Sequence, residues 1–448
     1  MNTLTPSPKL IAIQLKRAAM LALSATLFAC GGGGGGTTSP TATTFNLSGS
    51  LSGLRTGLQV SIANGAGAPV AFSANGSQTF ASNVPGTATY SLAISTQPVG
   101  QICSISNGSG TIAGVSVSNV AVSCADSLNL LAGGGSSNSN PDGTGASASF
   151  LNPRQIVSDA AGNLFVTDQS NHIVRKITPA GVVTTIAGSP TIPGTTDGTG
   201  TLARFTNPSG LTIDTTGNLY VSSDDNVVRK IDTNLVVSSI AGSTNTIFFR
   251  DGTGTFASFS GLANFAFGPD GNIYAASSQH HVIRKITPQG VATTFVGSPT
   301  VSGFADGAGS AALFNLPQGV AFDTQGNLYV AETGSPRIRK VTPAGVVSTM
   351  AGSGVSGLAD GTGTAAQFNL PLGLVVDAQG NVYVADTLND RIRKITPAGV
   401  VSTVIGTGTR GNVLAALPAR ISLPRGLALF DGKLFFTADN LVLWVYAP

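Results

Sequence analysis

A carboxylate recurs at regular spacing through the C-terminal two thirds of the chain, each time in the sequence Asp-Gly-x-Gly. Carboxylates of this kind are calcium ligands, but a calcium loop needs several oxygens from alternating positions. Each copy offers only one, so we expect the Asp to hydrogen-bond the backbone of its own turn or to cap the short turn that follows. The five copies begin at Asp142, Asp197, Asp251, Asp306 and Asp360.

The three histidines are the other side chains with metal-binding chemistry. His172 and His281 occupy the same place in two copies of the repeat described below, and His280 precedes His281. A zinc site needs further His, Cys or carboxylate ligands at short spacing, and none stands at that spacing here. We therefore expect these histidines to serve the structure, and we predict neither a metal ion nor a cofactor.

Basic residues recur with the same period, from Arg175-Lys176 to Arg393-Lys394. Nucleic-acid binding would require these cations to gather in a patch. One pair per repeat spreads them out instead, which gives nucleic-acid binding no support. We expect each Arg to lie across a neighbouring unit and to meet an acid, such as Asp168, Glu332 or Asp386.

All of these residues belong to a repeat of about 54 residues that runs from Asp142 to the C-terminus. Four short runs in each copy are β-branched or aromatic and are bounded by Gly, Pro, Asn or Asp, which predicts four strands. A repeat of this length and content predicts the blades of a β-propeller. A small residue followed two positions later by an aromatic one, as in Ala366 and Phe368, predicts packing between blades.

The sixth copy ends after three predicted strands, and this predicts how the ring closes. Residues 128–133 match the fourth strand pattern of the first copy, 183–188, so we expect them to complete the last blade. Closure by both ends of the chain removes the exposed strand edges of an open array. The sequence thus predicts an all-β fold with a six-bladed propeller over residues 127–448.

The repeats resemble the NHL-repeat family of β-propellers. The tripeptide that defines the family is present as Asn171-His172-Ile173, followed by Val174-Arg175-Lys176. Some six-bladed relatives are enzymes, among them gluconolactonase-like hydrolases, streptogramin lyase and peptidylglycine amidating lyase. They place carboxylates, Asn or His at the centre of one face, often around a divalent metal. The resemblance therefore implies either a binding propeller or an enzyme of this kind.

The first strand of each blade, which lines the axis, distinguishes these alternatives. General acid–base catalysis or metal activation of water at the axis needs ionisable or metal-ligating groups. The aligned first strands contain no ionisable side chain, so we predict no catalytic residue and favour binding. A metal-assisted lyase or lactonase is the alternative, because loops can still supply such groups. The aligned segments are 155–158, 210–213, 264–267, 319–322, 373–376 and 426–429.

The long connections before the first strands should emerge together on one face around the axis. Loops on a rigid scaffold are where binding residues usually lie. The most conspicuous insertion brings two aromatic residues and a cation to positions where other copies carry Pro, Gly or Ser. Phe248, Phe249 and Arg250 are therefore candidate binding residues. Burial of the aromatic rings beneath the loop is the other interpretation.

Residues 1–30 have the organisation of a signal peptide. A basic segment precedes the apolar stretch 18–28, and small residues lead to Cys30. This stretch is too short to span a bilayer. Its end resembles a bacterial lipobox, in which Cys30 is lipidated and becomes the new N-terminus. The basic segment contains Lys9, Lys16 and Arg17.

Residues 31–44 are rich in Gly, Thr, Ser and Pro and are expected to form a flexible tether. Gly31 follows the lipobox Cys where Asp would mark inner-membrane retention, so the resemblance favours the outer membrane of a Gram-negative bacterium. Whether the protein faces the periplasm or the cell surface stays open. Removal of the leader takes away three basic residues and no acid, which leaves 20 basic and 20 acidic residues.

Residues 45–125 form a separate unit whose single charged residue is Arg55. Strand patterns alternate with Asn-Gly turns, which predicts a small β-sandwich. The unit resembles a short module near the front of other proteobacterial lipoproteins. With Cys30 assigned to the lipid, Cys103 and Cys124 remain to form a disulfide in an oxidising compartment. Closing that loop adds about 3 kcal/mol by the chain-entropy model.

The sequence as a whole predicts a lipid-anchored binding protein of the envelope or cell surface. We expect a monomer that meets the membrane only through its lipid. Its partner is expected to be an envelope protein, peptide or glycan of unknown identity, bound through the loop face of the propeller. A purely structural role in the envelope stays open as well.

Overall fold

The protein is described by a computed structural model over residues 43–135, 141–244 and 248–448. This part of the chain contains eight β-sheets of four or five strands, joined by turns and single-turn 3-10 helices. The all-β fold class is confirmed. Cys30, the predicted signal peptide and most of the predicted tether lie outside the described residues. Within the described ranges, no helix has the length and apolar character needed to cross a membrane.

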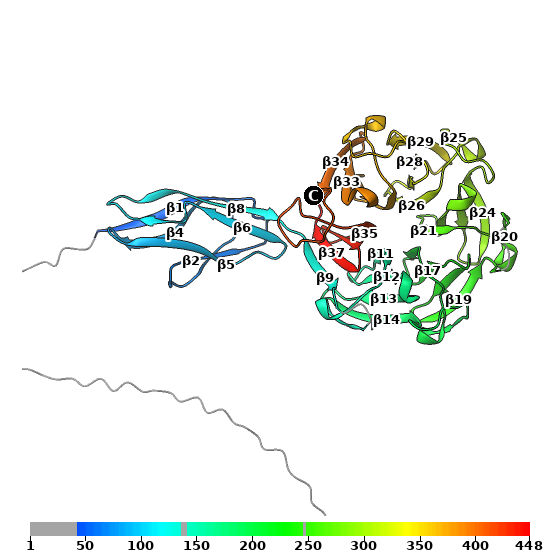
Figure 1. Ribbon diagram of the computed structural model, residues 1–448, viewed down its shortest axis with the longest axis horizontal. Coiled ribbons are helices and arrows are strands. Elements are labelled where there is room, and N and C mark those ends of the chain that lie inside the picture. The colour runs from blue at the N-terminus through cyan, green and yellow to red at the C-terminus, as the bar shows by residue number, and fades with distance from the viewer. Residues whose placement is uncertain (1–42, 136–140, 245–247) are drawn as a thin grey trace, which may run out of the picture. The chain divides into compact units, whose positions relative to one another are not determined.

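Two four-stranded sheets form the front module (Figure 1). Both sheets contribute to one hydrophobic cluster, which includes Leu47 and Phe80 from one sheet and Val60 and Leu92 from the other. Apolar residues alternate with exposed ones along these strands, so each sheet buries one face, as in a β-sandwich. In order, the first sheet contains β4 (Gly76–Pro85), β1 (Thr44–Ser52), β8 (Val117–Asp126) and β6 (Gln101–Ser106), and the second contains β3 (Val70–Phe72), β2 (Val60–Asn64), β5 (Thr89–Thr96) and β7 (Ser109–Thr111).

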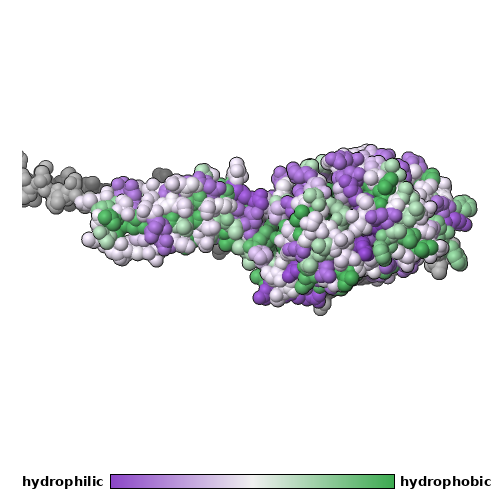
Figure 2. Space-filling model, turned by 90° about the horizontal axis from the view of Figure 1, so that it is seen from above, coloured by the Kyte–Doolittle hydropathy of each residue, from purple (hydrophilic) through white to green (hydrophobic). Residues whose placement is uncertain are grey.

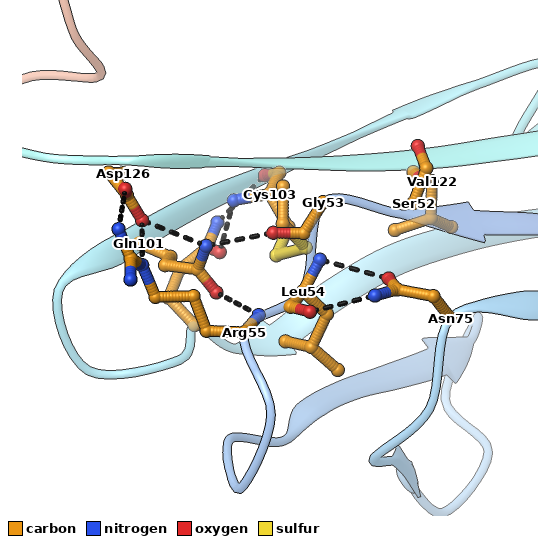
Figure 3. The surroundings of a disulfide bond; sticks show 11 residues. Ser52, Gly53, Leu54, Arg55, Asn75, Gln101, Cys103, Val122 and Asp126 are labelled. Carbon is orange, nitrogen blue, oxygen red and sulfur yellow. Dashed lines mark hydrogen bonds and ion pairs between the residues drawn. A yellow bond between two sulfur atoms is a disulfide. The ribbon is translucent and has the colours of Figure 1, made fainter. Parts of the chain in front are cut away.

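A disulfide joins Cys103 and Cys124, which face each other across β6 and β8 (Figure 3). The predicted pairing is confirmed. Close by, the Arg55 guanidinium donates to Asp126, with an Nε–Oδ1 distance of 2.8 Å, and Gln101 Nε2 donates to the same carboxylate oxygen at 3.1 Å. Because Asp126 lies in β8 and neutralises Arg55, the module extends at least one residue beyond the predicted end at 125. The boundary between module and propeller otherwise stays a prediction.

The remaining six sheets are the blades of the propeller, arranged around an axis (Figure 1). In each blade the strands are antiparallel, and the first strand packs against the first strands of the two neighbouring blades. Blades 1 to 5 also carry an outer strand of two residues, which the Asp-Gly-x-Gly passage provides and which pairs with the fourth strand.

The strands of blades 1 to 5 are given in the order first, second, third, fourth and outer. Blade 1 contains β11 (Pro153–Ser158), β12 (Leu164–Asp168), β13 (Ile173–Ile177), β14 (Val182–Gly188) and β10 (Gly143–Thr144). Blade 2 contains β16 (Leu211–Ile213), β17 (Leu219–Ser222), β18 (Val228–Ile231), β19 (Val236–Ala241) and β15 (Gly198–Thr199). Blade 3 contains β21 (Leu262–Phe267), β22 (Ile273–Ser277), β23 (Val282–Ile286), β24 (Val291–Gly297) and β20 (Gly252–Thr253). Blade 4 contains β26 (Pro317–Phe322), β27 (Leu328–Glu332), β28 (Arg337–Val341), β29 (Val346–Ala351) and β25 (Gly307–Ala308). Blade 5 contains β31 (Pro371–Val376), β32 (Val382–Asp386), β33 (Arg391–Ile395), β34 (Val400–Ile405) and β30 (Gly361–Thr362).

Short 3-10 helices occur at two places in the blades. One set follows the outer strand, and the other joins the second strand to the third. The first set is η1 (Gly145–Ser147), η3 (Gly200–Leu202), η4 (Gly254–Phe256), η6 (Gly309–Ala311) and η7 (Gly363–Ala365), and the second is η2 (Gln169–Asn171), η5 (Ser278–His280) and η8 (Thr387–Asn389).

Blade 6 is completed by a strand from the other end of the propeller sequence. Its strands are β35 (Pro424–Phe430), β36 (Lys433–Ala438), β37 (Leu441–Tyr446) and β9 (Asn129–Gly133). β9 pairs antiparallel with β37, with Ala132 opposite Val442. The predicted closure is therefore confirmed, with the strand one residue shorter than expected.

The small and aromatic columns of the repeat pack between blades, as predicted. Ala203 and Phe205 are fully buried in a cluster that also contains Val174 of blade 1 and Leu211 of blade 2. These two residues lie in the connection that leads into the first strand, so every blade docks on its neighbour through the segment that enters it. The same holds at the join between the last blade and the first, where Phe150 shares a cluster with Phe435.

The third-strand arginines are buried ion-pair centres, and here the structure corrects two expectations. Arg175 stays within its own blade, where Nη1 donates to Asp168 at 3.1 Å and Nη2 to Asp142 at 2.9 Å. Asp142 neither bonds its own turn nor caps η1. Its carboxylate accepts from the backbone and hydroxyl of Thr185 on the fourth strand. The Asp-Gly segment lies at the edge of its blade because the buried guanidinium of Arg175 needs an anion.

Substitution in β9 tests whether this strand closes the propeller. Ala132→Asp places a carboxylate at a fully buried position of β9, and we expect it to lower the free energy of unfolding by about 3 kcal/mol or more. Val355→Asp, at an exposed loop position, should change it by less than about 0.5 kcal/mol. Urea denaturation of both variants measures the difference, and equal effects would contradict closure by β9.

Candidate ligand-binding site

The first strands converge on a ring of six side chains at one end of the axis. Each position follows a Pro or Leu, which begins the first strand in five blades and lies three residues before it in blade 2. Together the six positions enclose a cavity of about 40 Å³. Two of them are arginines from the neighbouring blades 1 and 6. The six ring residues are Arg154, Ser209, Ala263, Gln318, Leu372 and Arg425.

These arginines overturn the prediction that the first strands carry no ionisable group. The strands of blades 1 and 6 begin at Pro153 and Pro424, two residues before the predicted segments. The alignment began at the regular hydrophobic pattern and so left out the one position that differs most between copies. A comparison of that column across the six repeats would have revealed Arg154 and Arg425.

The residue that follows each ring residue shows why the ring is narrow. Four blades have glycine there, because an added Cβ would lie almost on a carbonyl oxygen of the next blade. The distance would be 2.0 Å from Gly373 to the Arg425 oxygen and 2.3 Å from Gly426 to the Arg154 oxygen. Blades 1 and 3 break this rule with Gln155 and Asn264, and both side chains line the cavity. The cavity is thus built from departures from the repeat.

Hydroxyl groups of the second strands hold the ring in place. Thr437 Oγ1 accepts from the Gly426 N–H at 2.9 Å and donates to the Arg154 carbonyl at 2.8 Å. Thr167 does the same between Gln155 and the Ser209 carbonyl. These links are available because β11 and β35 each have a register shift next to the ring, which frees an N–H from the ladder. The ring backbone is therefore fixed from two blades at once.

The two ring arginines are half-buried, and they lack the carboxylate partners that the fully buried arginines have. No ion pair within 4 Å involves Arg154 or Arg425 among the described residues. Arg154 Nε donates to Gln169 Oε1 at 2.8 Å, whereas Arg425 Nη1 is buried and has no hydrogen-bond partner in the same ranges. Burial lowers the pKa of Arg154. Burial and the Arg154 charge lower the pKa of Arg425 to about 10, so both stay cationic at neutral pH.

Gln155 adds an acceptor to this cationic cavity. Its side chain is 5 % exposed, and its Oε1 atom is buried without a hydrogen-bond partner in the described residues. Beyond Gln155 the axis becomes apolar. There a second cavity of about 250 Å³ is lined by side chains such as Ile156, Phe265 and Leu427. Among the residues that line these two cavities, the charged ones are thus confined to the end where the long connections enter.

The three candidate binding residues in the insertion of blade 3 differ in exposure and in their contacts. Phe248 is 78 % exposed. Phe249 lies over the guanidinium of buried Arg284, 4.7 Å from ring centroid to Cζ, and its ring meets His280 edge to face. Arg250 is exposed and its Nε donates to the Phe256 carbonyl. Phe249 therefore serves the fold, and Phe248 is left as a contact candidate away from the ring.

Phe249 compensates for a missing acid. In blade 3 the residue at the end of the second strand is Ser277, where blades 1, 4 and 5 have Asp or Glu. Arg284 pairs with Asp251 and is enclosed by the rings of Phe249 and Phe259. Aromatic faces attract a desolvated cation, so the ring takes over part of the role of the carboxylate.

His172 and His281 are turn residues in two different blades. Both have left-handed backbone, with φ of 59° and 57°. Each ring Nδ1 accepts a backbone N–H of the next connection, from Asn207 at 3.1 Å and from Leu316 at 3.2 Å. Burial lowers the pKa of both imidazoles, which favours this neutral, accepting form. In the described ranges no group of three or more His, Cys, Asp or Glu is arranged to bind a metal ion.

Comparison with known proteins agrees with this architecture. The model of the NHL repeat matches residues 368–395. The match covers the first three strands of the fifth blade. NHL repeat-containing protein 2 of Homo sapiens is 26% identical over an alignment of 331 positions, which covers 65% of this chain and 45% of the relative. Protein SUPPRESSOR OF QUENCHING 1, chloroplastic, of Arabidopsis thaliana is 29% identical over 280 residues, 57% of this chain and 26% of that protein. The chain thus spans less than half the length of either curated relative.

Two solved structures from Bacteroides thetaiotaomicron share the fold over most of the chain. An auxiliary nutrient binding protein superposes with a TM-score of 0.55 at 15% identity, covering 86% of this chain and 90% of the other. A protein of unknown function gives a TM-score of 0.54 at 17% identity, with 87% and 90% covered. At this identity the likeness establishes the fold alone.

The two roles in the blade 3 insertion can be separated by substitution. Phe249→Ala uncovers the Arg284 guanidinium, and we expect it to lower the free energy of unfolding by about 1–2 kcal/mol. Phe248→Ala removes an exposed ring and should change it by less than about 0.5 kcal/mol. Chemical denaturation followed by circular dichroism compares them, and an equal loss in both would show that Phe248 is also packed.

Proposed function

We propose that this protein is a lipid-anchored binding protein of the bacterial envelope whose ligand enters the cavity at the axial ring. The observation that carries this proposal is the unpaired polarity of the cavity. Arg425 and Gln155 hold buried hydrogen-bonding atoms without partners in the described residues, whereas each fully buried arginine of the propeller pairs with a carboxylate. Buried polar groups without partners destabilise a fold, so their presence here favours a role in binding.

The position of the ring supports the loop face as the ligand face. Each ring residue directly follows the long connection that enters its blade, so the connections surround the cavity. A rigid ring beneath variable loops is a common arrangement for recognition. A ligand larger than the 40 Å³ cavity would place one group in the ring and the rest among the connections, which suits a peptide or glycan as well as a small molecule.

The residues of the ring favour binding over the lyase or lactonase alternative. The side chains that line the cavity come from Arg, Gln, Asn, Ser, Ala and Leu, and none from His, Asp or Glu. Arginine is a poor general base because it stays protonated. The cavity can therefore orient and neutralise a ligand, while proton transfer would need a group from the surrounding loops.

The envelope location rests on the leader and on the character of the surface. The predicted lipid at Cys30 supplies the only membrane contact that the proposal needs. On the face of the described residues shown in Figure 2, hydrophobic and hydrophilic residues are interspersed. Such a surface is typical of a protein in water and unlike a face that inserts into a bilayer.

Lipidation is tested at Cys30. Metabolic labelling with a palmitate analogue should label the wild-type protein, which should fractionate with membranes. Cys30→Ser should remove both the label and the membrane association, because lipid attachment needs the thiol. Cys103→Ser serves as the control for a cysteine elsewhere. An unlabelled, fully soluble wild-type protein would exclude the anchor.

Ligand binding at the ring is tested by filling the cavity. Ala263→Phe should block the cavity. Ala311→Phe adds a phenyl group at an exposed position of blade 4 that corresponds to exposed Phe256 in blade 3. We expect compounds from a panel of sugars, amino acids, organic acids and short peptides to raise the melting temperature of wild type and Ala311→Phe, but not of Ala263→Phe. Ligands that still bind Ala263→Phe would place the site elsewhere, and turnover of lactones would favour the enzyme.

A further inference from the structure

The two ring arginines differ from the fully buried arginines of the propeller. The third-strand arginines of blades 1, 4 and 5 each meet two carboxylates, as Arg393 does with Asp360 and Asp386. Arg154 and Arg425 come from adjacent blades and face the same cavity without any such partner. The carboxylates that act on them electrostatically, Asp224 and Asp439, form no ion pair with them within 4 Å.

This arrangement destabilises the empty protein. Two like charges repel each other, and partial burial deprives both of part of their water. The scaffold does not need them, because other blades have Ser, Ala, Gln or Leu at the same ring position. Their cost is offset when an anion enters, since guanidinium groups bind oxyanions through paired, charge-assisted N–H donors.

The size and lining of the cavity narrow the choice of anion. About 40 Å³ accommodates a small head group, and Ala263 and Leu372 bring carbon atoms to its wall. Gln155 contributes an amide whose buried oxygen lacks a donor. A complementary ligand therefore combines an acceptor for Arg425 with a donor for Gln155, next to a carbon frame. A carboxylate with a hydroxyl or ammonium group on the adjacent carbon has all three.

We infer that the axial cavity is a carboxylate-binding site for small 2-hydroxy or 2-amino acids, or for larger ligands that carry this group at one end. Arg154 and Arg425 bind the carboxylate, and Gln155 accepts from the neighbouring hydroxyl or ammonium. Asn264 and Gln318 complete the polar wall. The inference rests on the proposed function, because it assigns the chemistry of the same cavity.

The test uses the full-length, detergent-solubilised protein at pH 7.5 and constant ionic strength, with calorimetric titration and thermal shift. The probes are glycolate, glycine, acetate, inorganic phosphate and acetamide, the last being a neutral counterpart of acetate. We expect saturable binding of glycolate and glycine, about threefold to tenfold weaker binding of acetate, which lacks the donor, and none of acetamide.

Substitutions assign the contacts. Arg154→Gln and Arg425→Gln should each weaken glycolate binding by about tenfold or more. Gln155→Leu should abolish the preference for glycolate over acetate while acetate still binds. Arg420→Gln, at an exposed arginine, is the matched control and should bind as wild type does. Without ligand, Arg425→Gln should melt at or above the wild-type temperature, a result that a purely structural arginine would not give.

Three outcomes would overturn the inference. One is the absence of carboxylate binding, and another is binding that persists in both ring-arginine variants. The third is arginine-dependent phosphate binding that is tighter than binding of any carboxylate, which would make the cavity a phosphate site. If the first outcome is found but a neutral ligand binds wild type and is lost in Ala263→Phe, the proposed function stands and only the carboxylate inference fails.

Discussion

The buried arginine of the third strand is the interaction on which each of the first five blades depends. In blade 5 the Arg393 Nη1 donates to Asp386 at 2.8 Å and to the Gln367 carbonyl at 2.9 Å, while Nη2 reaches Asp360 and the guanidinium lies over Phe368. One side chain thus joins the second and third strands, the outer strand and the segment that docks on the preceding blade. Loss of one partner from such a buried pair typically costs about 3–5 kcal/mol. Blade 6 has Leu443 at the corresponding position of the third strand, opposite Phe436, and this blade is held by closure with β9.

A scaffold stabilised at its periphery leaves the axis free to vary. The ion pairs and the Ala and Phe columns lie between and within blades, and the ring side chains contribute to neither. The ring backbone is nevertheless rigid, because hydroxyls of the second strands bond the carbonyls of the next blade and glycines allow close approach. Side chains of any chemistry can therefore be presented at fixed positions. Arg154, Gln155 and Arg425 use this freedom, with unpaired charge and polarity as the cost.

Sequence reasoning succeeded where the determining interactions are local or periodic. The four strand patterns, the Ala and Phe columns and the missing strand of blade 6 all follow from alternation, turn residues and comparison of copies. It was wrong about Asp142, because the partner of that carboxylate lies on the fourth strand and only pairing across the blade brings Thr185 and Arg175 to it. It was also wrong about the axis, because the strand pattern was aligned one position past the ring.

The sequence by itself determined the all-β class, the number of blades, the order of their strands and the Cys103–Cys124 pairing, since each depends on repeated short patterns or on counting. Only the tertiary structure decided which side chains meet. Arg154 and Arg425 belong to the first and last blades and become neighbours because β9 closes the ring. The separation of Phe249, which covers Arg284, from exposed Phe248 likewise depends on how the insertion folds back. Charge, burial and partner are properties of a site in space, and a one-dimensional pattern does not contain them.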